Sequence, residues 1–218
     1  MAYTLDAFCK DCRAALTADT GPAGRQSVRA LLEKLLAEED FLAAHVLSAP
    51  PGRHTLYEDP ELGFVVLAHV NPSAGRSPPH DHGASWAVYG QATQYTDMTE
   101  WRRTAGGEGA AGPANLEVAR RYRLEPGHAG VYDIRAIHAI DYPAGARFLQ
   151  TLQVAHPHIG GKLVAFGHRA FRVGRAGRQG ALDYVGSQLQ QMVLAHAVPP
   201  TVMRSMRTVG IPTPTGTL

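Results

Sequence analysis

The middle of the chain alternates short apolar runs with turn residues, and this pattern limits the fold more than any other feature. Between about residues 55 and 171, segments rich in Val, Tyr, Ile and Thr are separated by Gly and Pro. β-Branched and aromatic residues suit a half-buried strand, whereas Gly and Pro end strands and form turns. Many short strands of this kind predict a β-sandwich or a β-barrel. The clearest strand candidates are residues 64–70, 85–89, 116–124 and 148–154.

Helical patterns flank this β region on both sides. In the first fifty residues, apolar side chains recur at the three-and-four spacing of one helix face, from Leu5 to Leu16 and from Val28 to Leu36, and a short third helix is expected from Asp40. Between residues 180 and 197 the same spacing predicts a final helix. We therefore expect one domain in three parts: a helical segment over residues 1–50, a barrel over 51–172, and a C-terminal helix and tail over 173–218.

Composition excludes several classes of function. The 218 residues include 21 basic and 19 acidic side chains, a formal charge of +2, so no nucleic-acid partner is indicated. No apolar run is long enough for a membrane span. Charged residues make up 18%, below the roughly 25% of ordinary soluble domains, which favours either a homo-oligomer interface or an unusually neutral surface. Cys9 and Cys12 lie on an apolar helix face, which indicates core residues, and the lack of a signal-peptide pattern predicts a cytoplasmic protein.

Two histidines one residue apart are the most informative motif. Alternate side chains of a strand share a face, so His80 and His82 can point to one place while Asp81 points away. A metal site needs a third ligand from a later strand, and His138 is the candidate because it follows the turn at residues 125–127. Three neutral imidazoles would leave positions on the ion open for a substrate and dioxygen.

These two histidine segments resemble the two motifs of the cupin superfamily, HxH followed by Gly and PxG followed by His. The resemblance covers about residues 60–155. It implies a mainly β protein: a cupin barrel, also called a double-stranded β-helix or jelly roll, with N-terminal helices and a C-terminal helix. Trp86 and Ala87 stand where many cupins have a ligating glutamate. The resulting three-histidine site is similar to that of the thiol dioxygenases, the cysteine dioxygenase and 3-mercaptopropionate dioxygenase group, and implies Fe(II). Nickel, manganese, zinc and copper also accept three imidazoles.

The sequence departs from the thiol dioxygenase pattern at two places. Ala87 stands near the cysteine that the mammalian-type enzyme crosslinks to a tyrosine, so that crosslink cannot form. The family's Ser-x-His-x-Tyr element aligns with residues 151–155, which keep only the hydroxyl of Thr151. The sequence also resembles uncharacterised double-stranded β-helix proteins that are described only as predicted metal-dependent enzymes.

Further site candidates come from the resemblance and from strand parity, which means that residues an even number of positions apart share a face of a strand. The resemblance places Arg53 or His54 near the family's carboxylate-binding arginine, with a surface loop residue as the alternative, and Gln153 where the family has a histidine. Trp86 shares parity with His82 and could line the pocket. The substrate-binding candidates are Arg53, His54, Trp86 and Thr151, and the catalytic candidates are Tyr132 and Gln153.

The roles of Tyr132, Tyr89 and His69 stay open between the histidine site and the core. Tyr132 shares parity with His138 and could place a phenol near the metal as an acid or hydrogen-bond donor, or it packs in the core. Tyr89 has the opposite parity to His82 unless a bulge intervenes. His69, in an apolar strand, is either a core histidine or a reserve ligand.

The sequence therefore predicts a cupin dioxygenase that uses Fe(II) and O2 to oxidise a small thiol- or carboxylate-bearing substrate. Two alternatives stay open. One is a dioxygenase of a non-thiol chelating substrate, such as a diketone or an enol. The other is a cupin that binds a small molecule without turning it over.

Overall fold

The computed structural model describes residues 2–105, 115–153 and 169–170. The helix expected between residues 180 and 197 lies outside this part of the chain. The described helices are α1 (Leu5–Ala18), α2 (Pro22–Leu36) and α3 (Glu39–Leu42), which continues into a π-helical turn (Ala43–Leu47). The strands are β1 (Gly52–Glu58), β2 (Phe64–Val70), β3 (Gly75–Arg76), β4 (His80–Asp81), β5 (Ala87–Thr93), β6 (Thr96–Ala105), β7 (Asn115–Leu124), β8 (Ala129–Tyr132), β9 (Ile137–Tyr142), β10 (Arg147–Gln153) and β11 (Arg169–Ala170).

The first two helices begin at residues that suit a helix start. The Thr4 side chain caps α1 by accepting a hydrogen bond from the backbone N–H of Ala7 at 3.2 Å. Pro22 occupies the first turn of α2, where a missing N–H costs nothing. Along the described part of the chain, no helix combines the length and the apolar character that crossing a membrane requires.

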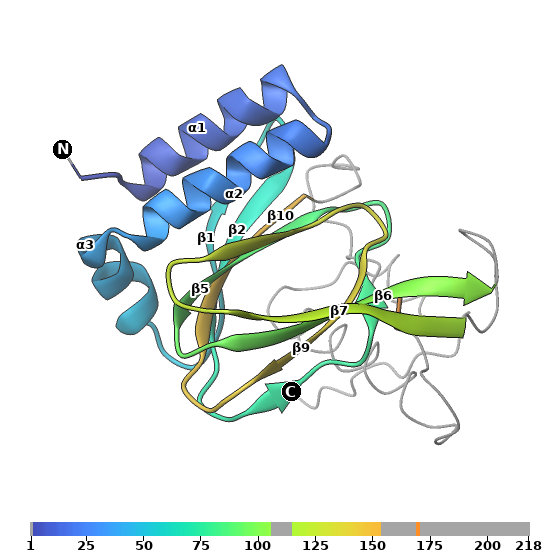
Figure 1. Ribbon diagram of the computed structural model, residues 1–218. Coiled ribbons are helices and arrows are strands. Elements are labelled where there is room, and N and C mark those ends of the chain that lie inside the picture. Colours follow the sequence, from blue (N-terminus) through green and yellow to red (C-terminus); the bar gives the residue numbers. More distant parts are fainter. Residues whose placement is uncertain (1, 106–114, 154–168, 171–218) are drawn as a thin grey trace, which may run out of the picture. The chain divides into compact units, whose positions relative to one another are not determined.

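The strands form two antiparallel sheets with jelly-roll connectivity (Figure 1). Their orders are β1-β2-β10-β5-β8 and β11-β4-β9-β6-β7, with β3 paired to β9. If β2 and β4 to β10 are numbered one to eight, the sheets read 1-8-3-6 and 2-7-4-5. This order is the double Greek key of the double-stranded β-helix, the fold of cupins among others. The predicted mainly β fold with N-terminal helices is confirmed.

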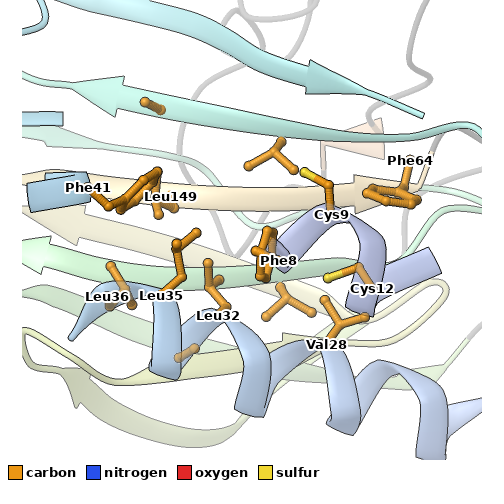
Figure 2. Close-up of a cluster of buried hydrophobic side chains, with 14 of the residues drawn as sticks. Phe8, Cys9, Cys12, Val28, Leu32, Leu35, Leu36, Phe41, Phe64 and Leu149 are labelled. Carbon is orange, nitrogen blue, oxygen red and sulfur yellow. The ribbon is translucent and has the colours of Figure 1, made fainter. Parts of the chain in front are cut away.

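One hydrophobic cluster joins the helices to the outer face of the first sheet. Inward-facing side chains of α1 and α2 meet the sheet residues Phe64 and Leu149, as Figure 2 shows. Cys9 and Cys12 are buried free thiols in this cluster. Helix α2 contacts β5 and β8 directly. At Gly90 of β5, a Cβ would lie 2.7 Å from Leu36 Cδ1 and 2.8 Å from Leu32 Cδ2, so the absence of a side chain lets α2 approach the sheet.

A second cluster fills the space between the two sheets. Its buried members alternate along the strands with those of the first cluster, as the period of two requires. On β10, for example, Phe148 and Leu152 face the barrel interior, whereas Leu149 faces the helices. The hollow beside Tyr89 and Phe148 has no room for a water molecule. The barrel is therefore packed there.

Candidate metal centre

Strand β4 and the turn that follows it hold the first two histidines. His80 lies on β4 and is the cross-strand partner of His138 on β9. After His82 the chain turns at Gly83, whose φ of 64° lies in the left-handed region. The Asp81 carboxylate accepts a hydrogen bond from the Gly83 N–H at 2.9 Å, so Asp81 stabilises the turn. The aspartate between the two histidines is thus used for backbone geometry.

The three histidines converge in the folded protein. One ring nitrogen from each of His80, His82 and His138 lies within 4.8 Å of the others. The ring centroids are 4.5 Å apart for His80 and His138, 5.1 Å for His82 and His138, and 5.3 Å for His80 and His82. All three side chains are buried. The sequence-predicted triad is brought together, and no second group of three such residues occurs among the described ones.

Backbone carbonyls determine which nitrogen two of these rings present. Nδ1 of His80 lies 3.0 Å from the Pro78 carbonyl, and Nδ1 of His138 lies 3.2 Å from the Ala136 carbonyl. Because a carbonyl oxygen can only accept, each Nδ1 carries the proton and each Nε2 presents its lone pair. Burial also lowers the pKa of His80, which favours the neutral ring. These are the outer contacts that orient metal-ligating histidines.

The donor set fits a divalent transition-metal ion. Three buried imidazoles supply neutral nitrogen ligands, which suit zinc, copper, iron and nickel. Three protein ligands also leave coordination positions for other molecules, as catalytic rather than structural sites do. The three-histidine group could therefore hold a divalent metal ion.

Tyr89 reaches this group, against the parity expectation. Its phenolic oxygen lies 3.2 Å from Nε2 of His82. The expectation assumed one continuous strand from His82 to Tyr89, but the chain leaves one sheet at Gly83 and enters the other at Ala87. That change of sheet resets the parity. Trp86 is displaced for the same reason: it is buried in the cluster beneath the helices and does not line the histidine group.

A polar row continues from Tyr89 across the inner face of the first sheet. Gln150 of β10 is the cross-strand partner of Tyr89, and its Nε2 donates to the phenolic oxygen at 2.9 Å. The Oε1 of Gln150 lies 3.0 Å from Nε2 of His69. His69 therefore lies in this row and is not one of the converging histidines. Sequence reasoning missed Gln150, although a polar residue alternating with Phe148 and Leu152 was a usable signal.

Tyr132 packs on the third histidine with its ring but directs its hydroxyl elsewhere. The ring centroids of Tyr132 and His138 are 4.5 Å apart. The Tyr132 hydroxyl is 2.6 Å from that of Tyr122, which in turn donates to Glu100 at 2.9 Å. Burial raises the pKa of Tyr132 well above the usual value, so the phenol stays protonated.

A carboxylate lies directly across from the third histidine but is held by other groups. Glu100 on β6 is the cross-strand partner of His138. Arg120 donates to both of its oxygens, at 2.9 and 2.7 Å, and Tyr122 donates to one of them. These bonds occupy the carboxylate in an ion pair at the barrel edge. The ligand group itself remains uncharged.

The other sequence candidates lie away from the histidines. On β10, Thr151 and Gln153 share the face of Leu149, which is directed at the helices, one residue out of phase with Gln150. Arg53 is exposed on β1 opposite His69. Nε2 of His54 bonds to the Pro50 carbonyl at 2.7 Å.

No family model matches the sequence, and no curated protein matches it. Among solved structures, the chain is similar to the cupin domain of Cnp3 from Schizosaccharomyces pombe, with 12% identity and a TM-score of 0.37 over 49% of this chain and 64% of that one. It is similar to an uncharacterised double-stranded β-helix protein from Klebsiella pneumoniae, with 13% identity and a TM-score of 0.36 over 57% and 81%. It is also similar to hydroquinone 1,2-dioxygenase PnpCD, with 15% identity and a TM-score of 0.38 over 58% of this chain and 77% of that one. The fold assignment rests on the strand order of the two sheets.

Proposed function

We propose that the protein is a metal-dependent dioxygenase that holds Fe(II) on His80, His82 and His138 and oxidises a small anionic substrate. The observation that carries this proposal is the convergence of three buried histidines without a carboxylate ligand among them. An Fe(II) ion in this group would supply the redox chemistry that activates dioxygen, and both oxygen atoms would enter the product.

The charge of the ligand group selects the substrate class. Three imidazoles bring no negative charge to a divalent ion. Of the carboxylates beside them, Asp81 accepts a hydrogen bond from the Gly83 N–H and Glu100 is paired with Arg120. A thiolate, carboxylate or enolate would balance that charge in a buried site, where an uncompensated charge is costly. A small chelating anion is therefore the substrate class that the site favours.

The surrounding side chains would position such a substrate and exclude water. The Tyr89 hydroxyl lies beside His82, where it can offer a hydrogen bond to an anionic oxygen or sulfur. The rings of Tyr89 and Tyr132 pack edge to face with centroids 5.3 Å apart, next to His138. These rings shield one side of the histidine group from solvent.

Two substrate types fit this description. A small thiol that carries a carboxylate is the first candidate, because the three-histidine ligand set is shared with the thiol dioxygenases that the sequence resembles. A planar enol or diketone is the second. The aromatic rings beside the histidines favour it, as does the position of Arg53 opposite His69 rather than beside the three ligands.

Oxygen consumption by the iron-loaded protein tests the proposal. The protein is loaded with Fe(II) without oxygen and then mixed with aerated buffer and cysteine, 3-mercaptopropionate, a β-diketone or a flavonol. We expect oxygen uptake with one of these classes, and two labelled atoms in the product when 18O2 is used. The metal-free protein is the control. Tight binding of metal and substrate without oxygen uptake would contradict the enzymatic proposal and favour a binding protein.

A further inference from the structure

We propose that Gln150 and His69 are positioning residues that hold the Tyr89 hydroxyl against the three-histidine group. The inference rests on the proposed metal site, but not on the identity of the substrate or on turnover. Gln150 bonds to Tyr89 and His69 bonds to Gln150, so both act on the histidine group through Tyr89.

The strand register places the row across neighbouring strands of one sheet. His69 lies on β2, Gln150 on β10 and Tyr89 on β5, in the order in which these strands pair. All three side chains share the face that lines the barrel interior. The hydrogen-bond distances are 3.0 Å between His69 and Gln150, 2.9 Å between Gln150 and Tyr89, and 3.2 Å between Tyr89 and His82. A continuous polar chain thus leads from the first sheet to a candidate metal ligand.

The direction of these hydrogen bonds orients the phenol. Since the Gln150 amide nitrogen donates to Tyr89, its oxygen is left to accept, and Nε2 of His69 must donate to it. His69 is also fixed in plane, because its ring stacks on Phe148 with centroids 4.5 Å apart. Reversing the Gln150 amide would require His69 to change tautomer at the same time. The anchored amide therefore donates to the Tyr89 oxygen and holds it where it can accept from Nε2–H of His82, which leaves the lone pair of His82 Nδ1 for the metal.

A structural role alone gives no reason for this row to end at a candidate ligand. Val65, Leu67 and Leu152 beside it are apolar, and the buried polar residues Gln91 and Thr96 bond to each other instead of joining the row. Apolar side chains would fill the same space without the desolvation penalty of a buried amide and imidazole. A buried polar row that ends at a candidate ligand is accounted for by its effect on that ligand and on the hydroxyl beside it.

The test measures how tightly the protein binds Co²⁺ alone, followed by its visible absorption. The variants are Tyr89→Phe, His69→Phe, Gln150→Leu and the double variant His69→Phe with Tyr89→Phe. His69→Phe keeps the stacking on Phe148 and removes only the donor. Gln153→Leu is the matched control, because it changes the same strand on its helix-facing side.

We expect Tyr89→Phe to weaken cobalt binding about tenfold, the low end for loss of a partner of a ligating histidine. His69→Phe and Gln150→Leu should weaken it in the same direction and shift the cobalt spectrum as Tyr89→Phe does. In the Tyr89→Phe background, His69→Phe should change the affinity by less than about twofold, because the two residues act through one chain. His69→Gln, which restores a donor, should recover most of the wild-type affinity, and Gln153→Leu should retain it.

Additive effects of His69→Phe and Tyr89→Phe, or an unchanged affinity in His69→Phe and Gln150→Leu, would overturn the proposal. If His69→Phe does not fold, the double-mutant cycle of Gln150→Leu and Tyr89→Phe tests the same coupling. Absence of oxygen uptake in a protein that shows this coupling would refute the dioxygenase function and leave the positioning role intact.

Discussion

His80 on β4 and His138 on β9 face each other across neighbouring strands, with ring centroids 4.5 Å apart. Their position opposite each other depends on the pairing of two strands that lie more than fifty residues apart in sequence. Because β4 is only two residues long, its position depends on the pairing with β9 and on the turn at Gly83. The proposed metal site and the jelly-roll connectivity are therefore parts of one arrangement.

Removal of one histidine should abolish stoichiometric metal binding. We expect His138→Ala to weaken Co²⁺ or Fe²⁺ binding by more than about 100-fold, since loss of an outer partner alone costs up to that amount. Elemental analysis of protein purified without chelators measures the effect. His128→Ala, which removes an exposed histidine in the turn before β8, is the control and should keep the metal. Equal metal content in both variants would place the metal elsewhere.

The protein should lose stability in mild acid because of His69. Burial lowers the pKa of His69 to about 4 in the folded state, against about 6.5 for an exposed histidine. Between these values the unfolded chain takes up a proton that the folded protein does not. The stabilisation is therefore complete above about pH 6.5 and is lost as the pH falls towards 4, by at most about 3 kcal/mol.

Urea unfolding at several pH values, without metal, measures this effect in the wild type and in His69→Gln. The difference between the two proteins cancels the contribution of other histidines, including His80. The free energy of unfolding should fall more steeply below pH 6.5 in the wild type than in His69→Gln. Parallel pH profiles would show that His69 is not held neutral.

Gly90→Ala should destabilise the contact between α2 and the barrel. A Cβ at this position would lie within 3 Å of Leu32 and Leu36, closer than packed carbon atoms approach. We expect a loss of about 1–3 kcal/mol in the free energy of unfolding, the usual cost of overpacking. Leu36→Ala should cost less in the Gly90→Ala background than in the wild type, because it removes one clashing group. Unchanged stability of Gly90→Ala would argue against the close packing of α2 on β5.

Arg25→Leu should weaken the segment that leads to His138. The buried Arg25 donates to Asp133 at 2.6 Å and to the Thr20 carbonyl at 3.1 Å, and so ties α2 to the turn between β8 and β9. Its removal should lower the free energy of unfolding by about 1–3 kcal/mol, as loss of a charged hydrogen-bond partner does. Arg76→Leu removes an exposed ion pair with Asp141 and should change it by less than about 1 kcal/mol. Equal effects of both substitutions would contradict a special role of Arg25.

Local sequence patterns predicted the elements and the triad well. The apolar spacing in α1 and α2 and the β-branched runs of β2 and β10 reflect periods of 3.6 and 2, which the backbone itself imposes. The HxH motif needs only local geometry to bring two imidazoles together. The third histidine was predicted from its place on a later strand after the turn at residues 125–127, which also matches the second cupin motif.

Parity counting failed where the chain changes sheets, and the resemblance pointed to Gln153 on β10 where the structure places Gln150 in the barrel. Tyr89 and Trp86 exchanged faces because the turn at Gly83 separates β4 from β5. Gln150, and not Gln153, lines the barrel because β10 aligns Phe148 with the interior. A one-residue shift of phase moves every side chain of a strand to the opposite face.

The amino-acid sequence by itself determined the N-terminal helices, several strands and the identity of three candidate ligands, since these depend on local periodicity and on a short motif, and its resemblance to cupins implied the jelly-roll class. Only the tertiary structure decided which side chains surround those ligands. The pairing of β2, β10 and β5 brings His69, Gln150 and Tyr89 into one hydrogen-bonded row, and the pairing of β6 with β9 sets Glu100 opposite His138. Such contacts join residues that are distant in the chain, and strand register, which the whole core determines, selects them.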